Sequence, residues 1–302
     1  MEREKGGVLW AVSAYLIWGV LPVYWKSLAH VSSGEILMGR IVWAFILTLL
    51  LILLLKGGKD LWVDIKKLWH TQKSFWSLFG ASLLISGNWF IYIWAVNEGF
   101  LVQTSLGYYM NPLVSVLLGI FFLKEKLSRS QKVAFLLAMI GVLILTVSYG
   151  KFPWIAFLLA VSFAVYGLVK KQVQLDALRG LTIETLFITP LALVFYMFLF
   201  VKGEAAFLHM NFKTDILLIL TGAVTAIPLV LFAKGAQRMP LYMVGFLQYI
   251  APTIMLFLGV VVYGETFGKV ELSAFSFIWF ALILFTVSKV MEVFKVKRLQ
   301  KI

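Results

Sequence analysis

The chain has 302 residues, of which 62% are apolar and only 14% are charged. Soluble domains usually contain roughly 45–50% apolar and about 25% charged residues, so this composition excludes a soluble protein and indicates an integral membrane protein. The formal net charge of +13 does not indicate nucleic-acid binding, because Lys and Arg occur in short stretches between apolar runs. Cysteine is absent, which excludes disulfides and thiolate chemistry.

Membrane-spanning helices are predicted wherever about 20 mostly apolar residues follow one another. The first half of the chain contains five such segments: Gly6–Trp25, Ile36–Leu55, Phe75–Asn97, Phe100–Leu123 and Val133–Tyr149. The second half contains five more: Phe152–Val169, Leu181–Val201, Ile216–Ala233, Leu241–Tyr263 and Leu272–Ser288. Lipid does not satisfy open backbone groups, and these runs are too continuous for barrel strands. We therefore expect an all-α membrane protein with ten transmembrane helices.

The distribution of basic residues predicts how the chain is oriented in the membrane. When the N-terminus is placed inside, most Lys and Arg residues fall on the inner side, including those at positions 56–73 and 289–301. Few remain on the outer side, so both termini are expected in the cytoplasm. No small-residue cleavage site follows the first apolar run, which we therefore interpret as a span and not as a removed signal.

Two stretches repeat one pattern without a gap: "GYYMNPLVSVLLGIFFLKEKL" at 107–127 and "LQYIAPTIMLFLGVVVYGETF" at 247–267. The aligned pairs include Tyr109 and Tyr249, Pro112 and Pro252, Gly119 and Gly259, and Glu125 and Glu265. Similar composition alone is the alternative, but Pro and Glu are rare in these spans. Because five spans precede the second copy, that copy enters the membrane inverted, and a site is expected near the midplane. The predicted repeats are residues 1–150 and 151–302.

The repeated prolines lie inside spans, where each deprives the carbonyl four residues earlier of its helical partner. Those carbonyls belong to Tyr108 and Gln248. Broken backbone at membrane depth is tolerated where it is buried or lines a watery cavity, so we expect these helices to line a central cavity. Small residues that only permit close packing are the alternative. The candidate helix-break or gating residues are Pro112, Pro252, Gly119 and Gly259.

Other polar residues inside spans are further candidates for a binding site. Arg40 either extends its stem to the headgroups or attracts an anionic or dipolar group, and Asn88 either joins two helices or contacts a substrate. Glu35 and Glu184 near the starts of their spans are expected mainly as helix N-terminal charges. The candidate substrate-binding residues are Arg40, Asn88, Tyr108, Asn111, Gln248 and Tyr249.

Enzyme signatures are missing from the sequence. No HExxH motif or ATP-binding loop occurs, and the three His residues lie in separate connectors. The sequence therefore predicts no catalytic residue, no metal site and no cofactor.

Several segments together resemble a known family: "EILMGRIVWAF", "SGNWFIYIWAVN", "TSLGYYMNPLVSVLLG" and "GFLQYIAPT". They resemble the EamA group of the drug/metabolite transporter superfamily, and within it the bacterial RarD branch, over nearly the whole chain. The resemblance implies two inverted five-helix repeats, a central cavity, and export or exchange of small solutes across the bacterial inner membrane.

The expected function is a secondary transporter that works by alternating access. The alternatives are a lipid flippase and a membrane-embedded enzyme acting on lipids. The expected partners are an unidentified small-molecule substrate, the lipid bilayer and a second copy of the chain in a homodimer, with no nucleic acid.

Overall fold

The computed structural model describes residues 2–98, 100–173, 175–264 and 268–299. Within these ranges the chain contains no strand, and ten of its helical segments are long and apolar enough to cross a membrane. The predicted fold class, an all-α protein with ten spans, is thereby confirmed.

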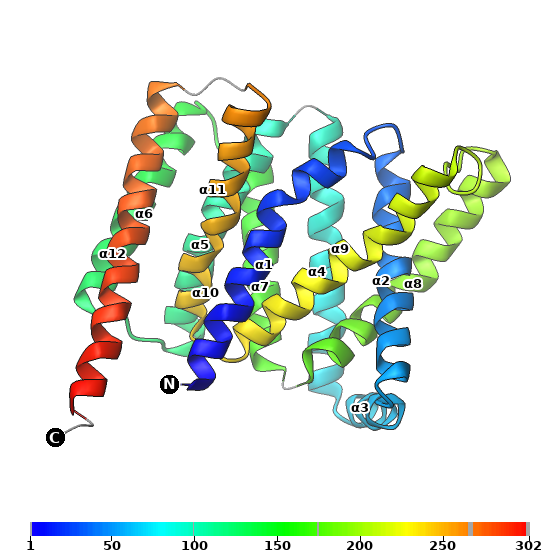
Figure 1. Ribbon diagram of the computed structural model, residues 1–302, viewed down its shortest axis with the longest axis horizontal. Helices are drawn as coiled ribbons and strands as arrows, with labels where there is room; N and C mark the ends of the chain where they lie inside the picture. The colour runs from blue at the N-terminus through cyan, green and yellow to red at the C-terminus, as the bar shows by residue number, and fades with distance from the viewer. Residues whose placement is uncertain (1, 99, 174, 265–267, 300–302) are drawn as a thin grey trace.

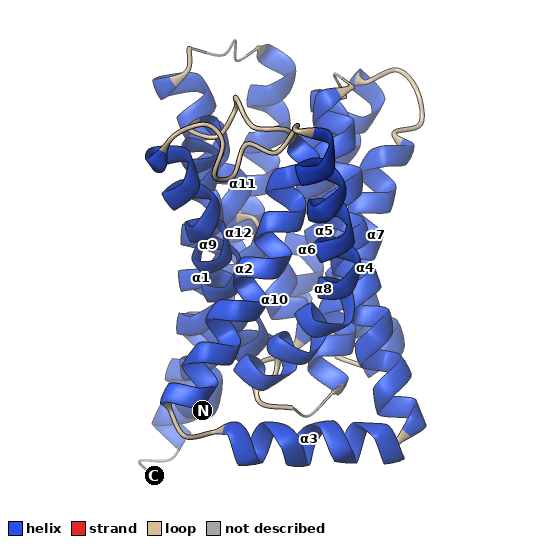
Figure 2. Ribbon diagram, turned by 90° about the vertical axis from the view of Figure 1, so that its right-hand side faces the viewer, coloured by secondary structure: helices blue, strands red, loops and turns tan. Residues whose placement is uncertain are grey.

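The first half of the chain supplies five spans and one short helix. These elements are α1 (Glu2–Lys26), α2 (Ser33–Leu54), α3 (Gly58–His70), α4 (Gln72–Asn97), α5 (Leu101–Leu123) and α6 (Arg129–Ser148). Helix α3 occupies a connector and runs across one end of the bundle (Figure 2). Leu61 and Leu68 of α3 are buried, whereas Trp62 and Trp69 are exposed, so α3 has the two faces of a helix that lies along a membrane surface.

The second half repeats this plan without a counterpart of α3. Its elements are α7 (Trp154–Gln172), α8 (Ala177–Lys202), α9 (Phe212–Ala236), α10 (Leu241–Gln248), α11 (Ile250–Phe257), the π-helical turn η1 (Leu258–Val262) and α12 (Lys269–Leu299). Elements α10, α11 and η1 together form one span. The starts of α1 and the ends of α12 lie at the same end of the bundle, on the side of α3 (Figure 1).

Local sequence signals explain where several helices begin. The Ser128 side chain accepts the backbone N–H of Gln131, and the Gln131 side chain accepts that of Ser128, which forms a capping box at the start of α6. Asp176 caps α8 and Asn211 caps α9 in the same sense, by accepting N–H groups of the first turn. Gly203 ends α8 with a φ of +69°, a conformation that glycine adopts without strain.

Contacts between helices follow an inverted two-fold plan. The counterparts in the two halves are α1 and α7, α4 and α9, and α5 and α10–α11. The contact of α5 with α7 corresponds to that of α11 with α1, and the contact of α1 with α9 corresponds to that of α7 with α4. All four contacts are present. The pairs α2–α8, α5–α10 and α6–α12 map onto themselves and lie on the pseudo-axis. The fold therefore has the two inverted five-helix repeats that an odd number of spans per copy requires.

The two proline-bearing spans cross at the centre of this arrangement. A Cβ atom added to Gly245 of α10 would lie 2.7 Å from the carbonyl oxygen of Pro112, so only glycine allows this approach. The Tyr109 hydroxyl of α5 donates a 3.3 Å hydrogen bond to the carbonyl oxygen of Pro252. Helix α5 nevertheless continues through Pro112, whereas its counterpart is interrupted at Tyr249 and widens into η1.

Candidate functional site

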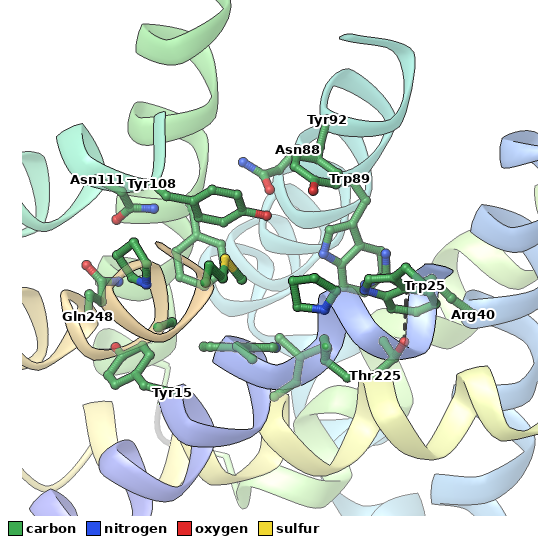
Figure 3. A pocket seen from close by; sticks show the side chains of 18 residues that line it. Tyr15, Trp25, Arg40, Asn88, Trp89, Tyr92, Tyr108, Asn111, Thr225 and Gln248 are labelled. Carbon is green, nitrogen blue, oxygen red and sulfur yellow. Dashed lines mark hydrogen bonds between the residues drawn. The ribbon is translucent and has the colours of Figure 1, made fainter. Parts of the chain in front are cut away.

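A cavity of about 120 Å³ lies between the two repeats, large enough for several water molecules or a small solute. Helices α1, α2, α4 and α5 of the first repeat and α7, α9, α10 and α11 of the second contribute to its wall. Figure 3 shows polar side chains at three places on this wall, around Arg40, around Gln248 and around Asn88. The remaining surface is largely aromatic and apolar.

Arg40, in the second turn of α2, is held from three directions. Its guanidinium carbon lies 4.7 Å from the ring centroid of Trp25 and 4.4 Å from that of Trp89. Its Nε donates a 3.0 Å hydrogen bond to Oγ1 of Thr225 on α9 (Figure 3). Cation–π contacts with two indoles stabilise a charge that lipid would not tolerate. The guanidinium therefore stays in the cavity wall and does not extend to the headgroups.

The second polar group joins the two proline-bearing spans. Ser115 of α5 lies between two amides, with its Oγ 3.2 Å from Oδ1 of Asn111 and 3.1 Å from Oε1 of Gln248. Asn111 and Gln248 both line the cavity. The amide groups thus provide neutral hydrogen-bonding atoms at the seam between the repeats.

Asn88 of α4 combines the two interpretations that its sequence position allows. Its Nδ2 donates 2.9 Å hydrogen bonds to the carbonyl oxygen of Leu159 and to Oγ of Ser162, both on α7. The residue also lines the cavity. Asn88 therefore fixes α4 against α7 while presenting the rest of its amide to the cavity.

Tyr108 and Tyr92 form the wall between these groups. Their rings meet edge to face at a centroid distance of 5.7 Å. Tyr108 exposes 38% of its surface, and because it lines the cavity, it is available to a bound solute.

The candidate residues named from the sequence separate into two sets. Arg40, Asn88, Tyr108, Asn111, Gln248 and Pro252 line the cavity. The structure does not place Tyr249, Pro112, Gly119 or Gly259 on that wall. Tyr249 is 1% exposed, and its hydroxyl has no hydrogen-bond partner among the described residues.

Other lining residues were not predicted as site residues. Tyr15, Trp25, Trp89, Tyr92 and Thr225 belong to this set. Trp25 stands at the end of an apolar run, which is typical of an interfacial anchor, and the sequence alone does not distinguish the two positions. The spacing of Thr221 and Thr225 on one face of a span is a signal that would have found Thr225.

Two buried acids have partners that the sequence did not indicate. Glu35, expected as an interfacial helix charge, is fully buried and accepts the backbone N–H groups of Ala206 and Phe207 at 2.8–3.0 Å. Glu184 forms a 2.7 Å ion pair with Lys170 and accepts the Tyr166 hydroxyl at 3.1 Å. These carboxylates are therefore tertiary contacts.

The cavity lies toward the end of the bundle opposite the termini. Its wall includes Trp25 in the last turn of α1, Arg40 near the start of α2, and Tyr108 near the start of α5. At the other end, Glu125 accepts the backbone N–H of Leu241 at 2.7 Å and that of Tyr242 at 2.9 Å. This contact ties the segment after α5 to the start of α10 at the end of the bundle that carries the termini.

Ten spans around a largely apolar internal cavity that holds a few polar side chains define a multi-pass membrane protein with a solute-sized site. The model of the EamA-like transporter family matches residues 5–147 and again residues 152–287. The chain belongs to the EamA-like transporter family.

Named relatives agree with this assignment. The chain is 49% identical over 289 residues to "Uncharacterized transporter YojE" of Bacillus subtilis, covering 95% of this chain and 96% of that one. It is 39% identical over 290 residues to "Protein RarD" of Escherichia coli, covering 96% of each chain. A solved crystal structure matches with a TM-score of 0.71 and 18% identity over 94% of this chain and 98% of its own, which supports the fold. The lipid-handling alternative finds no support among these relatives.

Proposed function

We propose that the protein is a secondary transporter that exports or exchanges a small organic solute by alternating access. The carrying observation is the cavity between the repeats, which lies toward one end of the bundle, while at the other end Glu125 joins the two repeats on what we take as the closed side. In alternating access, one repeat rocks against the other around a central site. The inverted repeats, divided near residue 150, give the two end states related geometries.

The proposal also covers the location of the protein and its partners. The positive-inside distribution favours an orientation with both termini in the cytoplasm of a bacterium and the protein in its inner membrane. The bilayer and the transported solute are the proposed partners, together with a second copy in a homodimer. The protein acts on its solute by moving it and carries out no bond chemistry.

The residues proposed to bind the solute are Arg40, Asn88, Tyr108, Asn111 and Gln248, which meet at the cavity. Tyr249 supports this wall from behind. Pro112, Pro252, Gly119 and Gly259 are proposed as gating residues of the moving spans, although α5 stays helical through Pro112 in this conformation. Hydrogen bonds from amides and hydroxyls orient a solute, while aromatic rings bury its apolar part.

The test begins with a comparison of the metabolites released by cells that contain or lack the protein. The compound found in this way is then loaded into liposomes that contain purified protein, and its exchange is measured. Gln248→Ala and Tyr108→Ala are expected to slow exchange about tenfold or more without loss of folded protein, because each removes a contact in the cavity. Gln172→Ala, on the exposed end of α7, is the matched control and should exchange at the wild-type rate. Wild-type exchange by both cavity variants would contradict the site, and no exchange by any form would contradict the function.

A further inference from the structure

The terminal amino groups of Arg40 are the unused part of an otherwise held side chain. Trp25 and Trp89 contact the guanidinium, and Thr225 uses its Nε. Within the described residues, Nη1 and Nη2 have no hydrogen bond to a side chain or carbonyl, and Arg40 has no ion pair. Because Arg40 lines the cavity, these four N–H donors are available to a solute.

The acids buried in the described bundle do not neutralise this charge. Glu35 accepts backbone N–H groups of the segment between α8 and α9, and Glu184 pairs with Lys170. None of the described residues that line the cavity is Asp or Glu. The cavity therefore carries one positive charge, and a buried charge without a partner is costly in a protein interior.

We propose that the cavity binds a small organic monoanion whose carboxylate pairs with the terminal amino groups of Arg40. The edge of a guanidinium matches the two oxygens of a carboxylate and forms two parallel hydrogen bonds. The indoles of Trp25 and Trp89 stabilise the guanidinium in position, so little side-chain freedom is lost on binding.

The rest of the cavity wall determines which chemical groups this anion can carry besides its carboxylate. Trp18, Phe163 and Met255 offer apolar surface, and the amides of Asn111 and Gln248 offer neutral hydrogen-bonding atoms. An ammonium group would find no carboxylate on this wall, so amines and zwitterionic amino acids are disfavoured. This substrate class deepens the proposed transport function and rests on the same cavity.

The experiment measures equilibrium binding by the purified full-length protein, through the thermal stabilisation that a ligand gives. The probes are benzoate, its neutral analogue benzamide, the cation benzylamine and the zwitterion phenylalanine; acetate, acetamide and ethylamine form a smaller series. The carboxylate of each series is expected to bind about tenfold or more tightly than its amide or amine. Arg40→Gln should remove that preference, and Arg40→Lys should restore only part of it, because an ammonium lacks the fork of a guanidinium.

The outcomes separate this proposal from the transport function. Preferential binding of benzylamine or phenylalanine, an unchanged carboxylate preference in Arg40→Gln, or no stabilisation by either carboxylate would overturn the substrate class. The wild-type comparison needs no variant, so a folding defect in Arg40→Gln does not blunt the test. Carboxylate binding without exchange in liposomes would instead contradict the transport function. Exchange without a charge preference would contradict only the proposed monoanionic substrate class.

Discussion

At the scale of single residues, the protein treats its buried charges in two different ways. Arg40 is held by rings and one hydroxyl, with its outer edge toward the cavity. Lys170 and Glu184 instead neutralise each other, with side chains only 4% and 1% exposed. A paired charge stabilises packing between α7 and α8, whereas an unpaired charge in a cavity is suited to recognition.

The Lys170–Glu184 pair gives a prediction about stability. Lys170→Met leaves a buried carboxylate without its partner and is expected to lower the free energy of unfolding by about 3–5 kcal/mol. The double variant Lys170→Met/Glu184→Gln removes both charges and keeps an acceptor for the Tyr166 hydroxyl, so it should recover most of that loss. Thermal unfolding in detergent measures both.

Lys59→Met is the control for this pair, because Lys59 is an exposed residue of α3. It should unfold like the wild type. A Lys170→Met protein as stable as the wild type, or a double variant no better than the single one, would show that the pair does not stabilise the fold.

At the scale of helices, the start of α10 is the most specific contact on the closed side. Glu125 is 11% exposed, accepts two N–H groups of α10, and has Lys171 Nζ 3.7 Å from its Oε1. A carboxylate at a helix N-terminus makes charge-assisted hydrogen bonds. A Cβ on Gly119 would lie 2.5 Å from Oε2 of Glu125, so a larger residue here would displace that carboxylate.

We expect that weakening this contact loosens the closed side of the bundle. Glu125→Gln removes the charge, and Gly119→Ala displaces the carboxylate. In a protein that has no natural cysteine, a cysteine placed at the fully buried Ala11 of α1 reports the opening. A water-soluble maleimide added from the side of the termini should label it roughly tenfold faster in either variant, because each loses at least one charge-assisted hydrogen bond.

Gly80→Ala is the matched glycine control, because an added Cβ there meets nothing within 4 Å. It should leave the labelling rate of Ala11→Cys unchanged. Equal rates in Gly119→Ala, Gly80→Ala and the unmodified background would mean that Glu125 does not hold the closed side.

At the scale of the whole molecule, the fold could be predicted from features of the sequence alone. Long apolar runs specify spans because lipid accepts only helices with satisfied backbone groups. The shared Pro, Gly and Glu positions of 107–127 and 247–267 specified the repeat, and an odd number of spans specified its inversion. The division of the chain near residue 150 stays a prediction.

The site was harder to predict from the sequence, because it depends on which helices contact one another. Polar residues inside spans, such as Arg40 and Gln248, are rare enough to be noticed in the sequence. Thr225 becomes a partner of Arg40 only because α9 packs on α2. Tyr249 follows Gln248 directly, yet one helical step of about 100° carries it into the packed interior.

The position of the cavity leads to a prediction about sidedness. The positive-inside rule predicts that the termini and α3 lie in the cytoplasm, and in that orientation the cavity should be reached from outside the cell in this conformation. Three single-cysteine variants test this: Met255→Cys in the cavity wall, Met210→Cys on the exposed segment between α8 and α9, and Lys59→Cys on α3. In intact cells, an impermeant maleimide should label Met210→Cys quickly and Met255→Cys more slowly, because the cavity restricts access. Lys59→Cys should react only after the membrane is permeabilised.

Labelling of Lys59→Cys in intact cells would show that the orientation is the reverse of the predicted one. Labelling of Met255→Cys only after permeabilisation, with Met210→Cys reactive from outside, would mean that the cavity opens toward the termini.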